Sequence, residues 1–272
     1  MSEVGALAYE ALRQFLVREV AIELGPDRQY LVSSRLHTLA LRGGFSSIDE
    51  LVFAMQSGRR RDLIQGVIDA MVTNETFFFR DKPVFDTLVT SVIPRLFEQR
   101  RGDNIRVWSA ASASGQEPYS LAMLILDRLP NLAKRLSILA TDVSVEMVER
   151  VRKGWFSHLE MSRGLPPVYQ KTFFQPAGDG FQLRADVRSL VKSEVLNLIR
   201  PWPGMGPFEL VFLRNVLIYF PQQYKRQVIA QLERTLLPGS VVLLGTGESM
   251  LGLSEKFETV RLAQAQFHRF AP

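Results

Sequence analysis

From about Ile105 onward, short runs rich in Val, Ile, Leu and Phe alternate with longer segments of helical periodicity. This alternation favours a parallel sheet with helices on its faces, because a crossover between parallel strands needs the length of a helix. The predicted strands are Ile105–Ser109, Ser137–Thr141, Val195–Leu198, Glu209–Leu213 and Val241–Gly245. A last run, Ala263–Phe270, is predicted to add an antiparallel strand at the edge of the sheet.

The chain up to about Thr73 has helical periodicity and no strand pattern. Apolar residues recur at three- and four-residue spacing in Tyr9–Val20 and again in Leu31–Leu39. The sequence therefore predicts a small all-helical domain over residues 1–75, followed by an α/β domain over residues 76–272.

A long connection, Gly154–Asp186, separates the second and third predicted strands. Within it, Gly178-Asp179-Gly180 lies between two β-rich runs, Thr172–Phe174 and Phe181–Arg184. A glycine-rich turn between two β-rich runs is typical of a β-hairpin. We therefore expect a small antiparallel β insertion at about residues 154–190.

Composition and charge exclude several classes of protein. The absence of cysteine excludes disulfides and thiolate zinc sites, and His37, His158 and His268 lack the spacing of metal ligands, so no metal is expected. No uncharged apolar run approaches the roughly 18 residues of a membrane-spanning helix, so we expect a cytoplasmic protein that is not embedded in a membrane. The net charge of +5 favours an acidic partner without identifying it.

The loop after the first predicted strand, Ser112–Glu117, lies where ligands of doubly wound sheets bind. It has one glycine, Gly115, where dinucleotide-binding loops carry G-x-G-x-x-G, and it offers the carboxylate of Glu117. A second acid, Asp142, follows the next strand. Two acids suit a cationic ligand with a ribose, S-adenosylmethionine, better than an anionic pyrophosphate. Alternatively, Glu117 only stabilises the positive end of a helix dipole.

The junction of the two expected domains, Thr73–Arg80, reads TNETFFFR. Its three phenylalanines are expected to pack the helical domain against the sheet. Asn74, Thr76 and Arg80 surround them with an amide, a hydroxyl and a guanidinium. These polar groups belong to the binding site only if the junction also covers the ligand.

Five motifs occur in order along the chain: TNETFFFR, WSAASASGQEPYSLA, LATDVS, VLNL and FLRNVLIYF. In this order they resemble the chemotaxis receptor methyltransferases, the CheR family of S-adenosylmethionine-dependent glutamate O-methyltransferases. The similarity extends over nearly the whole chain. It implies a small all-helical N-terminal domain that docks the substrate, followed by a doubly wound, Rossmann-like methyltransferase sheet with a small antiparallel β insertion.

The resemblance also implies roles for individual residues. Asp142 matches the acid that holds the ribose of S-adenosylmethionine, and Arg80 and Tyr219 match residues that line the methyl-transfer site. The residues that match cofactor contacts are Asn74, Thr76, Arg80, Glu117, Asp142, Asn197, Leu198, Leu213, Arg214 and Asn215. The implied product is S-adenosylhomocysteine.

The implied partner is the cytoplasmic coiled-coil region of chemotaxis receptors. Arg28, Arg35 and Arg42 are seven residues apart and form one basic stripe if residues 27–42 are helical, so the stripe is a candidate for docking on a glutamate-rich coiled coil. A solvated helix face is the alternative. The resemblance departs from the family at one place: members that bind a C-terminal receptor pentapeptide have a longer glycine-containing turn in the β insertion than QPAGDGFQ. This departure favours an enzyme that does not depend on the pentapeptide.

Two other functions agree with parts of the sequence. A nucleic-acid methyltransferase would use the basic charge, but RNVLIYF occupies the place where base-methylating enzymes carry a D-P-P-Y-like motif, so no nucleic-acid partner is expected. A scaffold that binds the cofactor and docks on receptors without turnover is the second alternative. A dehydrogenase is disfavoured by the missing glycine fingerprint.

Overall fold

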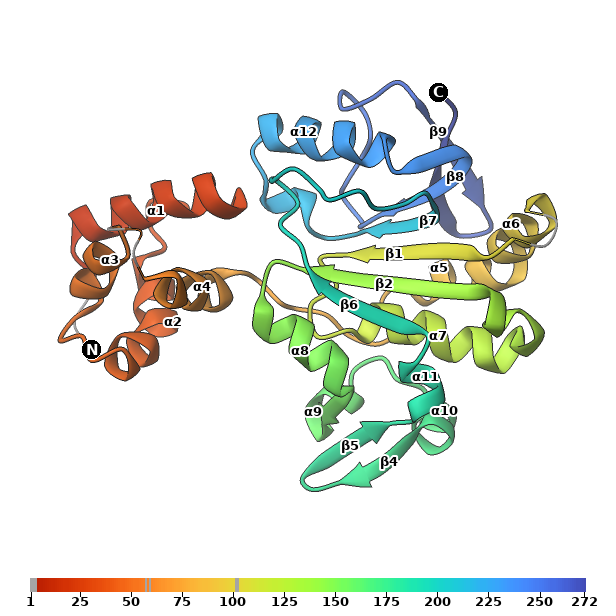
Figure 1. The fold of residues 1–272 in the computed structure, drawn as a ribbon, viewed down its shortest axis with the longest axis horizontal. Coiled ribbons are helices and arrows are strands. Elements are labelled where there is room, and N and C mark those ends of the chain that lie inside the picture. Colours follow the sequence, from red (N-terminus) through yellow and green to blue (C-terminus); the bar gives the residue numbers. More distant parts are fainter. Residues whose placement is uncertain (1–3, 57, 59, 101–102) are drawn as a thin grey trace.

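The computed structural model describes residues 4–56, 58, 60–100 and 103–272, which form a helical bundle joined to an α/β domain (Figure 1). The bundle comprises α1 (Ala6–Val20), α2 (Gln29–Arg42), α3 (Ile48–Gln56) and α4 (Arg61–Met71). Its core contains Leu12, Leu16, Leu36, Leu51 and Val67, whose side chains are inaccessible to solvent. The helical spacing of the apolar residues therefore identified the bundle and its buried face.

The α/β domain contains a sheet of seven strands in the order β6-β2-β1-β7-β8-β10-β9. The strands are β1 (Ile105–Ala110), β2 (Leu136–Asp142), β6 (Val191–Val195), β7 (Phe208–Leu213), β8 (Leu236–Leu244), β9 (Phe257–Leu262) and β10 (Ala265–Phe270). The first five in this order are parallel, and β10 is antiparallel to both β8 and β9. The predicted doubly wound fold is confirmed.

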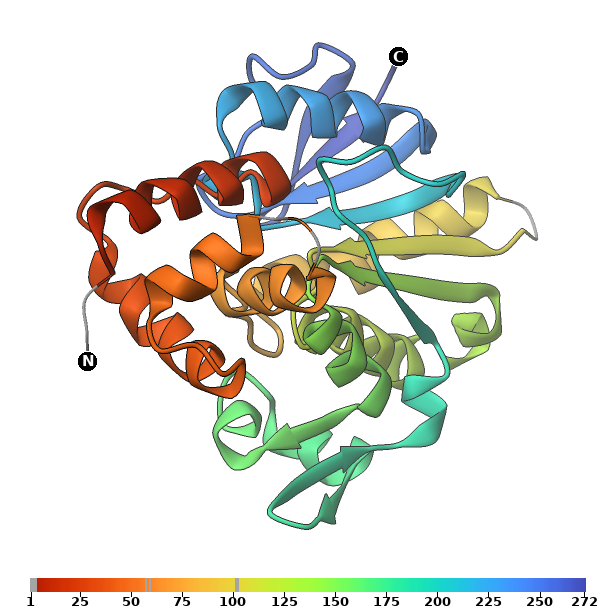
Figure 2. The same ribbon diagram turned by 60° about the vertical axis from the view of Figure 1, so that its left-hand side comes forward.

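Helices cover both faces of the sheet (Figures 1 and 2). One face packs against a continuous helical stretch, α5 (Lys82–Thr87), a π-helical turn (Leu88–Val92) and α6 (Ile93–Gln99), and against α7 (Gln116–Arg128). The other face packs against α12 (Gln222–Glu233). Alternate residues of β1 serve the two cores, since Val107 belongs to the first and Trp108 to the second. The remaining helical segments of this sheet domain are η2 (Pro130–Arg135), α8 (Val145–Lys153) and η3 (Leu217–Tyr219).

Two strand predictions were wrong. The third strand was predicted at Val195–Leu198, but β6 comprises Val191–Val195. The prediction missed it because β6 is an edge strand whose only buried side chain is Ser193, so its sequence carries no apolar run. The run Ala263–Phe270 was placed at the sheet edge, but β10 lies between β8 and β9. The true edge strand, β9, has no buried side chain and therefore gave no apolar pattern.

The β insertion forms a second, three-stranded antiparallel sheet in the order β3-β5-β4. Its elements are β3 (Trp155–Ser157), α9 (His158–Met161), α10 (Pro167–Phe173), β4 (Phe174–Ala177), β5 (Gly180–Leu183) and α11 (Ala185–Arg188). The hairpin was predicted, although β3 was not. Phe78 of the domain junction packs edge-on against Phe156 and Phe174, with ring centroids 5.0 and 5.8 Å apart, and so anchors the insertion.

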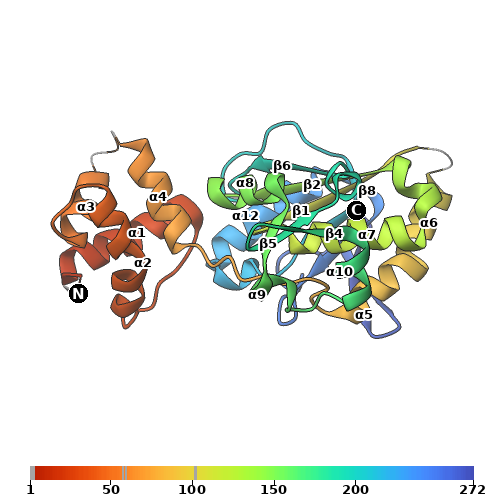
Figure 3. The same cartoon turned by 90° about the horizontal axis from the view of Figure 1, so that it is seen from below.

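Polar contacts join the helical bundle to the sheet domain, which lie next to each other along the long axis (Figure 3). Asn197 Nδ2 donates a hydrogen bond to the carbonyl of Glu19 (2.6 Å), and Arg200 forms an ion pair with the Glu19 carboxylate (2.6 Å). Gln65 of α4 donates to the carbonyl of Val143 (3.1 Å). None of the helices in the described parts of the chain is long and apolar enough to cross a membrane.

We expect Gly164→Ala to lower the free energy of unfolding more than Gly178→Ala. Both glycines have left-handed φ angles, 78° and 63°, so alanine costs roughly 1–2 kcal/mol at either site. A Cβ at Gly164 would lie 2.0 Å from the carbonyl oxygen of Phe78, whereas a Cβ at Gly178 meets nothing within 4 Å. Urea denaturation followed by circular dichroism measures the difference, and equal losses would contradict the expected clash.

Candidate functional site

A cleft lies at the carboxyl ends of β1, β2, β6 and β7, where the sheet domain meets the helical bundle. It encloses about 930 Å³, including its opening to solvent. Its walls come from the end of α1, from the domain junction and from the loops that follow the four strands. Ligands of doubly wound sheets bind at this edge, next to the carboxyl ends of the strands.

The loop after β1 adopts left-handed backbone conformations at every second residue. Ala111, Ala113 and Gly115 have φ angles of 52°, 48° and 95°. Such conformations are unfavourable for alanine and tend to occur at functional sites. The loop thus makes its tight turn with small side chains and a single glycine, and the N–H of Ala113 donates to Asp142 Oδ2 at 2.9 Å.

Asp142 at the end of β2 lines the cleft and is almost fully buried. Burial raises the pKa of its carboxyl group, and the backbone N–H groups of Ser144, Ala113 and Val143 offset part of that rise. Oδ1 accepts from the Ser144 N–H at 2.9 Å. Each carboxylate oxygen has further lone pairs, so Asp142 is able to accept hydrogen bonds from ligand hydroxyls as well.

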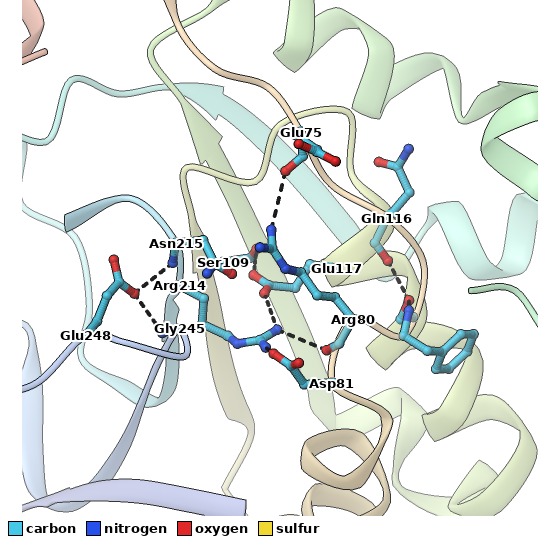
Figure 4. Close-up of polar contacts among 12 residues, drawn as sticks. Glu75, Arg80, Asp81, Ser109, Gln116, Glu117, Arg214, Asn215, Gly245 and Glu248 are labelled. Carbon is cyan, nitrogen blue, oxygen red and sulfur yellow. Dashed lines mark hydrogen bonds and ion pairs between the residues drawn. The ribbon is translucent and has the colours of Figure 1, made fainter. Parts of the chain in front are cut away.

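Glu117, at the start of α7, belongs to a buried network of charged groups (Figure 4). Its carboxylate accepts from Ser109 Oγ at 2.8 Å and from Arg214 Nη1 at 3.1 Å. Arg214 follows β7, its side chain is 2% exposed, and its Nη2 pairs with the carboxylate of Asp81. The acids that line the cleft outnumber its guanidinium groups by three to two, and this excess of negative charge favours a cationic ligand.

Arg80 and Tyr219 both belong to the lining of the cleft. The guanidinium of Arg80 lies 5.5 Å from the ring centroid of Phe77, and its Nη1 makes a long hydrogen bond of 3.5 Å to the carbonyl of Glu75. Tyr219 lies at the end of η3 and is 38% exposed. Neither residue is buried, so both are candidates for contact with an incoming side chain.

Arg163 of the β insertion lies near the same aromatic ring. Its guanidinium is 5.4 Å from the Phe77 centroid and forms an ion pair with Glu75 at 2.8 Å. The hydrogen bond and charge of Arg163 hold the pKa of the exposed Glu75 carboxyl below its usual value. The insertion thus supports the segment that carries Arg80.

Glu248 organises the loop after β7 and was not recognised from the sequence. Its carboxylate accepts four backbone N–H groups, those of Gly245 (2.6 Å), Asn215 (2.7 Å), Val216 (3.0 Å) and Ile218 (3.1 Å). A Cβ at Gly245 would lie 2.5 Å from Asn215 Nδ2, so a glycine is needed there. The only sequence signal is an acid three residues beyond the glycine that ends a predicted strand.

The other predicted cofactor residues differ in their positions. Asn74, Thr76, Asn197, Leu198 and Asn215 line the cleft, whereas Leu213 is buried in β7. Besides its bond to Glu19, the Asn197 side chain accepts from the N–H of Ile199 at 3.1 Å. Apolar cleft residues that the sequence did not indicate are Val20, Ile22, Val72, Val143, Leu196, Val216 and Phe220.

The predicted docking arginines lie on α2, outside the cleft lining. The helix begins at Gln29, so Arg28 is its N-cap residue, and both Arg28 and Arg42 are exposed. Arg35 is half-buried, and its Nη1 donates to the carbonyls of Met71 (2.8 Å) and Val72 (3.2 Å) at the end of α4. Arg35 therefore stabilises the bundle, whatever else it contacts.

The residues of the cleft fit S-adenosylmethionine. Within the described part of the chain, two buried polar atoms of lining residues, Ser112 Oγ and Arg214 Nε, have no hydrogen-bond partner. Buried polar groups are rarely left unpaired, so they indicate a polar ligand. The carboxylate of Asp142 suits the hydroxyls of a ribose, and the apolar lining residues suit an adenine. Among the described residues, no group of three or more His, Cys, Asp and Glu side chains is placed to hold a metal ion.

Comparisons with known proteins agree with this site. A family described as "CheR methyltransferase, all-alpha domain" matches residues 7–72, and one described as "CheR methyltransferase, SAM binding domain" matches residues 74–266. Together the two matches span the bundle, the junction and the whole cleft.

Named relatives match over almost the full chain. A "Chemotaxis protein methyltransferase" of Vibrio parahaemolyticus is 43% identical over 257 residues, which is 93% of each chain. A "Chemotaxis protein methyltransferase 1" of Pseudomonas aeruginosa is 39% identical over 266 residues, 96% of this chain and 97% of the relative. An Escherichia coli "Chemotaxis protein methyltransferase" is 28% identical over 253 residues, 92% and 86% of the two chains. This chain is therefore a member of the CheR methyltransferase family, and residues 74–266 are its S-adenosylmethionine-binding methyltransferase domain.

Proposed function

We propose that this methyltransferase esterifies glutamate side chains of chemotaxis receptors. The observation that carries the proposal is the grouping of Arg80 and Tyr219 with Asp142 and Glu117 in one cleft. The names of the relatives, chemotaxis protein methyltransferases, support a receptor as the substrate. The acceptor would be the glutamate-rich coiled coil of the receptor on the cytoplasmic side, which places the enzyme in the cytoplasm.

Different parts of the cleft would hold different parts of the cofactor. Asp142 would accept the ribose hydroxyls, and Asn197 and Leu198 would contact the adenine. Asn74, Thr76, Glu117, Arg214 and Asn215 would surround the methionine end. Bound S-adenosylmethionine supplies a methyl group on a cationic sulfur and leaves as S-adenosylhomocysteine.

Glutamate methylation at this site needs no general base. The pKa of an unperturbed glutamate is about 4.3, so the acceptor is already ionised at neutral pH. The guanidinium of Arg80 would attract the acceptor carboxylate, and the hydroxyl of Tyr219 would donate to it. Their task is to align the carboxylate oxygen with the methyl group, because positioning supplies most of the rate in such a reaction.

The helical bundle is the proposed docking domain for the receptor. Arg28 and Arg42 present exposed guanidinium groups at the two ends of α2. The turn between β4 and β5 comprises only Gly178 and Asp179, which supports docking that does not depend on a receptor pentapeptide.

The test of the proposed function uses the purified protein, methyl-labelled S-adenosylmethionine and receptor-containing membranes. Mild base should release the label from the receptor as volatile methanol, because a glutamate methyl ester hydrolyses under these conditions. Cofactor binding without any base-labile label would instead favour a docking scaffold without turnover. Base-stable label on added nucleic acid would instead favour a nucleic-acid methyltransferase.

Neutralising Asp142 and removing Arg80 should affect different steps. We expect Asp142→Asn to weaken binding of S-adenosylmethionine about tenfold, since one charge-assisted hydrogen bond contributes roughly 1.5 kcal/mol or more. Arg80→Ala should lower kcat about a hundredfold with a smaller loss of cofactor affinity. Calorimetry and single-turnover methylation separate the two effects, with Asp179→Asn on the exposed hairpin turn as the charge control. Unchanged affinity in Asp142→Asn would refute the ribose assignment.

Charge reversal on α2 tests receptor docking. We expect Arg42→Glu to raise the KM for receptor membranes severalfold while kcat and cofactor affinity stay unchanged, because Arg42 is exposed and lies outside the cleft lining. Arg42 is a better choice than Arg35, which holds the end of α4. Arg128→Glu, on an exposed residue of the sheet domain, is the control. If Arg42→Glu has the same KM for receptor membranes as the control, Arg42 does not take part in docking.

A further inference from the structure

The segment that carries Arg80 is held in an unfavourable backbone conformation. Phe79 and Asp81, on either side of Arg80, have left-handed φ angles of 54° and 63°. Such angles are unfavourable for residues other than glycine, so the surrounding structure must fix both. Part of this support comes from Ser120 on α7, whose Oγ accepts the Phe79 N–H at 2.9 Å.

The second support is the guanidinium of Arg214 (Figure 4). Its Nη1 donates to the backbone carbonyl of Arg80 at 3.3 Å, and its Nη2 pairs with the Asp81 side chain. Asp81 is the N-cap residue of α5, but its side chain makes no capping hydrogen bond there. The carboxylate of Asp81 is therefore directed to Arg214 and not to the helix that follows it.

The same guanidinium is anchored to the cofactor side of the cleft. Its Nη1 also donates to Glu117 at 3.1 Å, and Glu117 is fixed in turn by Ser109 of β1. One buried cation thus joins the end of β7 to the start of α7 and to the turn at Arg80. Lysine is unable to replace it, because an ammonium group lacks the planar fork that reaches three acceptors in fixed directions.

We propose that Arg214 is a positioning residue that fixes the turn at Arg80 through Asp81, so that Arg80 faces the acceptor carboxylate. This inference rests on the proposed function, in which Arg80 aligns that carboxylate. Its physical basis is that the carbonyl bond and the ion pair act on the backbone of Arg80 and on the residue next to it. The side-chain contacts of Arg80 among the described residues are weaker: a long hydrogen bond to the Glu75 carbonyl, attraction to the Glu75 carboxylate and the ring of Phe77.

We call the contacts of Arg214 with Asp81 and with the carbonyl of Arg80 the clamp, and Asp81→Asn is the variant that isolates it. Removing Arg214 would leave two acids without their cation and risks unfolding the protein. The Asp81 side chain is 42% exposed, and asparagine tolerates left-handed φ angles, so Asp81→Asn removes the ion pair and keeps the backbone preference. Asp86→Asn is the matched control, because Asp86 is an exposed acid of the same segment that pairs only with Lys82 in its salt bridge.

Two measurements on these variants test the clamp. Methylation of receptor membranes should show kcat lowered about tenfold in Asp81→Asn, with the KM for S-adenosylmethionine within about twofold, since misplacing a catalytic group slows turnover more than it weakens cofactor binding. Amide hydrogen exchange of the protein without substrate should be faster at residues 78–82 in Asp81→Asn than in Asp86→Asn. Asp81→Glu, which restores the charge, should recover part of kcat.

Other outcomes would overturn the inference. A kcat equal to that of Asp86→Asn would show that the ion pair does not position Arg80. A loss of cofactor affinity at unchanged kcat would assign the network to cofactor binding alone. Equal exchange rates in the two variants would show that the turn needs no clamp. Because exchange requires no substrate, it judges the clamp even if the wild-type protein transfers no methyl group to receptors, which would refute the proposed function separately.

Discussion

The buried guanidinium of Arg214 is the group on which the arrangement of the cleft depends. A cation taken out of water is tolerated only when acids and carbonyls surround it closely, so its burial dictates where Glu117 and Asp81 must lie. These two acids belong to α7 and to the segment before α5, so one electrostatic requirement fixes two further elements relative to β7. Glu248 acts in the opposite sense, because its carboxylate collects backbone N–H groups from two loops. Charge burial therefore holds together segments that lie far apart in the chain.

Within the large sheet, the strands that were predicted well are those whose side chains are buried on both faces. All six residues of β7 are buried, and such strands read as continuous apolar runs. The edge strands β6 and β9 bury one side chain and none, respectively, so neither had a pattern to read. Their positions come from backbone pairing with a neighbouring strand, and backbone groups are the same for every sequence.

Prediction of the site was limited in a similar way. Asp142 and Glu117 were found because each lies soon after a predicted strand, and ligands of such sheets bind at the carboxyl ends of the strands. Their position after a strand is a local signal. The partners of Glu117 were not found, because Arg214 lies 97 residues from Glu117 along the chain. The other acid that pairs with Arg214, Asp81, lies 133 residues from Arg214. Arg35 shows the same limit, because the spacing of seven gave its place on the helix but not its bonds to the end of α4. The motif resemblance supplied residue roles that no spacing argument contains.

The helical bundle contributes one wall of the cleft, through Val20 and Ile22 at the end of α1, and Glu19 next to them binds Asn197. The boundary between the two family matches, near residue 73, therefore does not divide the protein into independent modules. A chimera that takes its first 72 residues from a relative inherits part of that relative's cofactor pocket together with any partner preference of its bundle. Selection on one of these traits thus acts on the other, and the two are expected to change together among relatives.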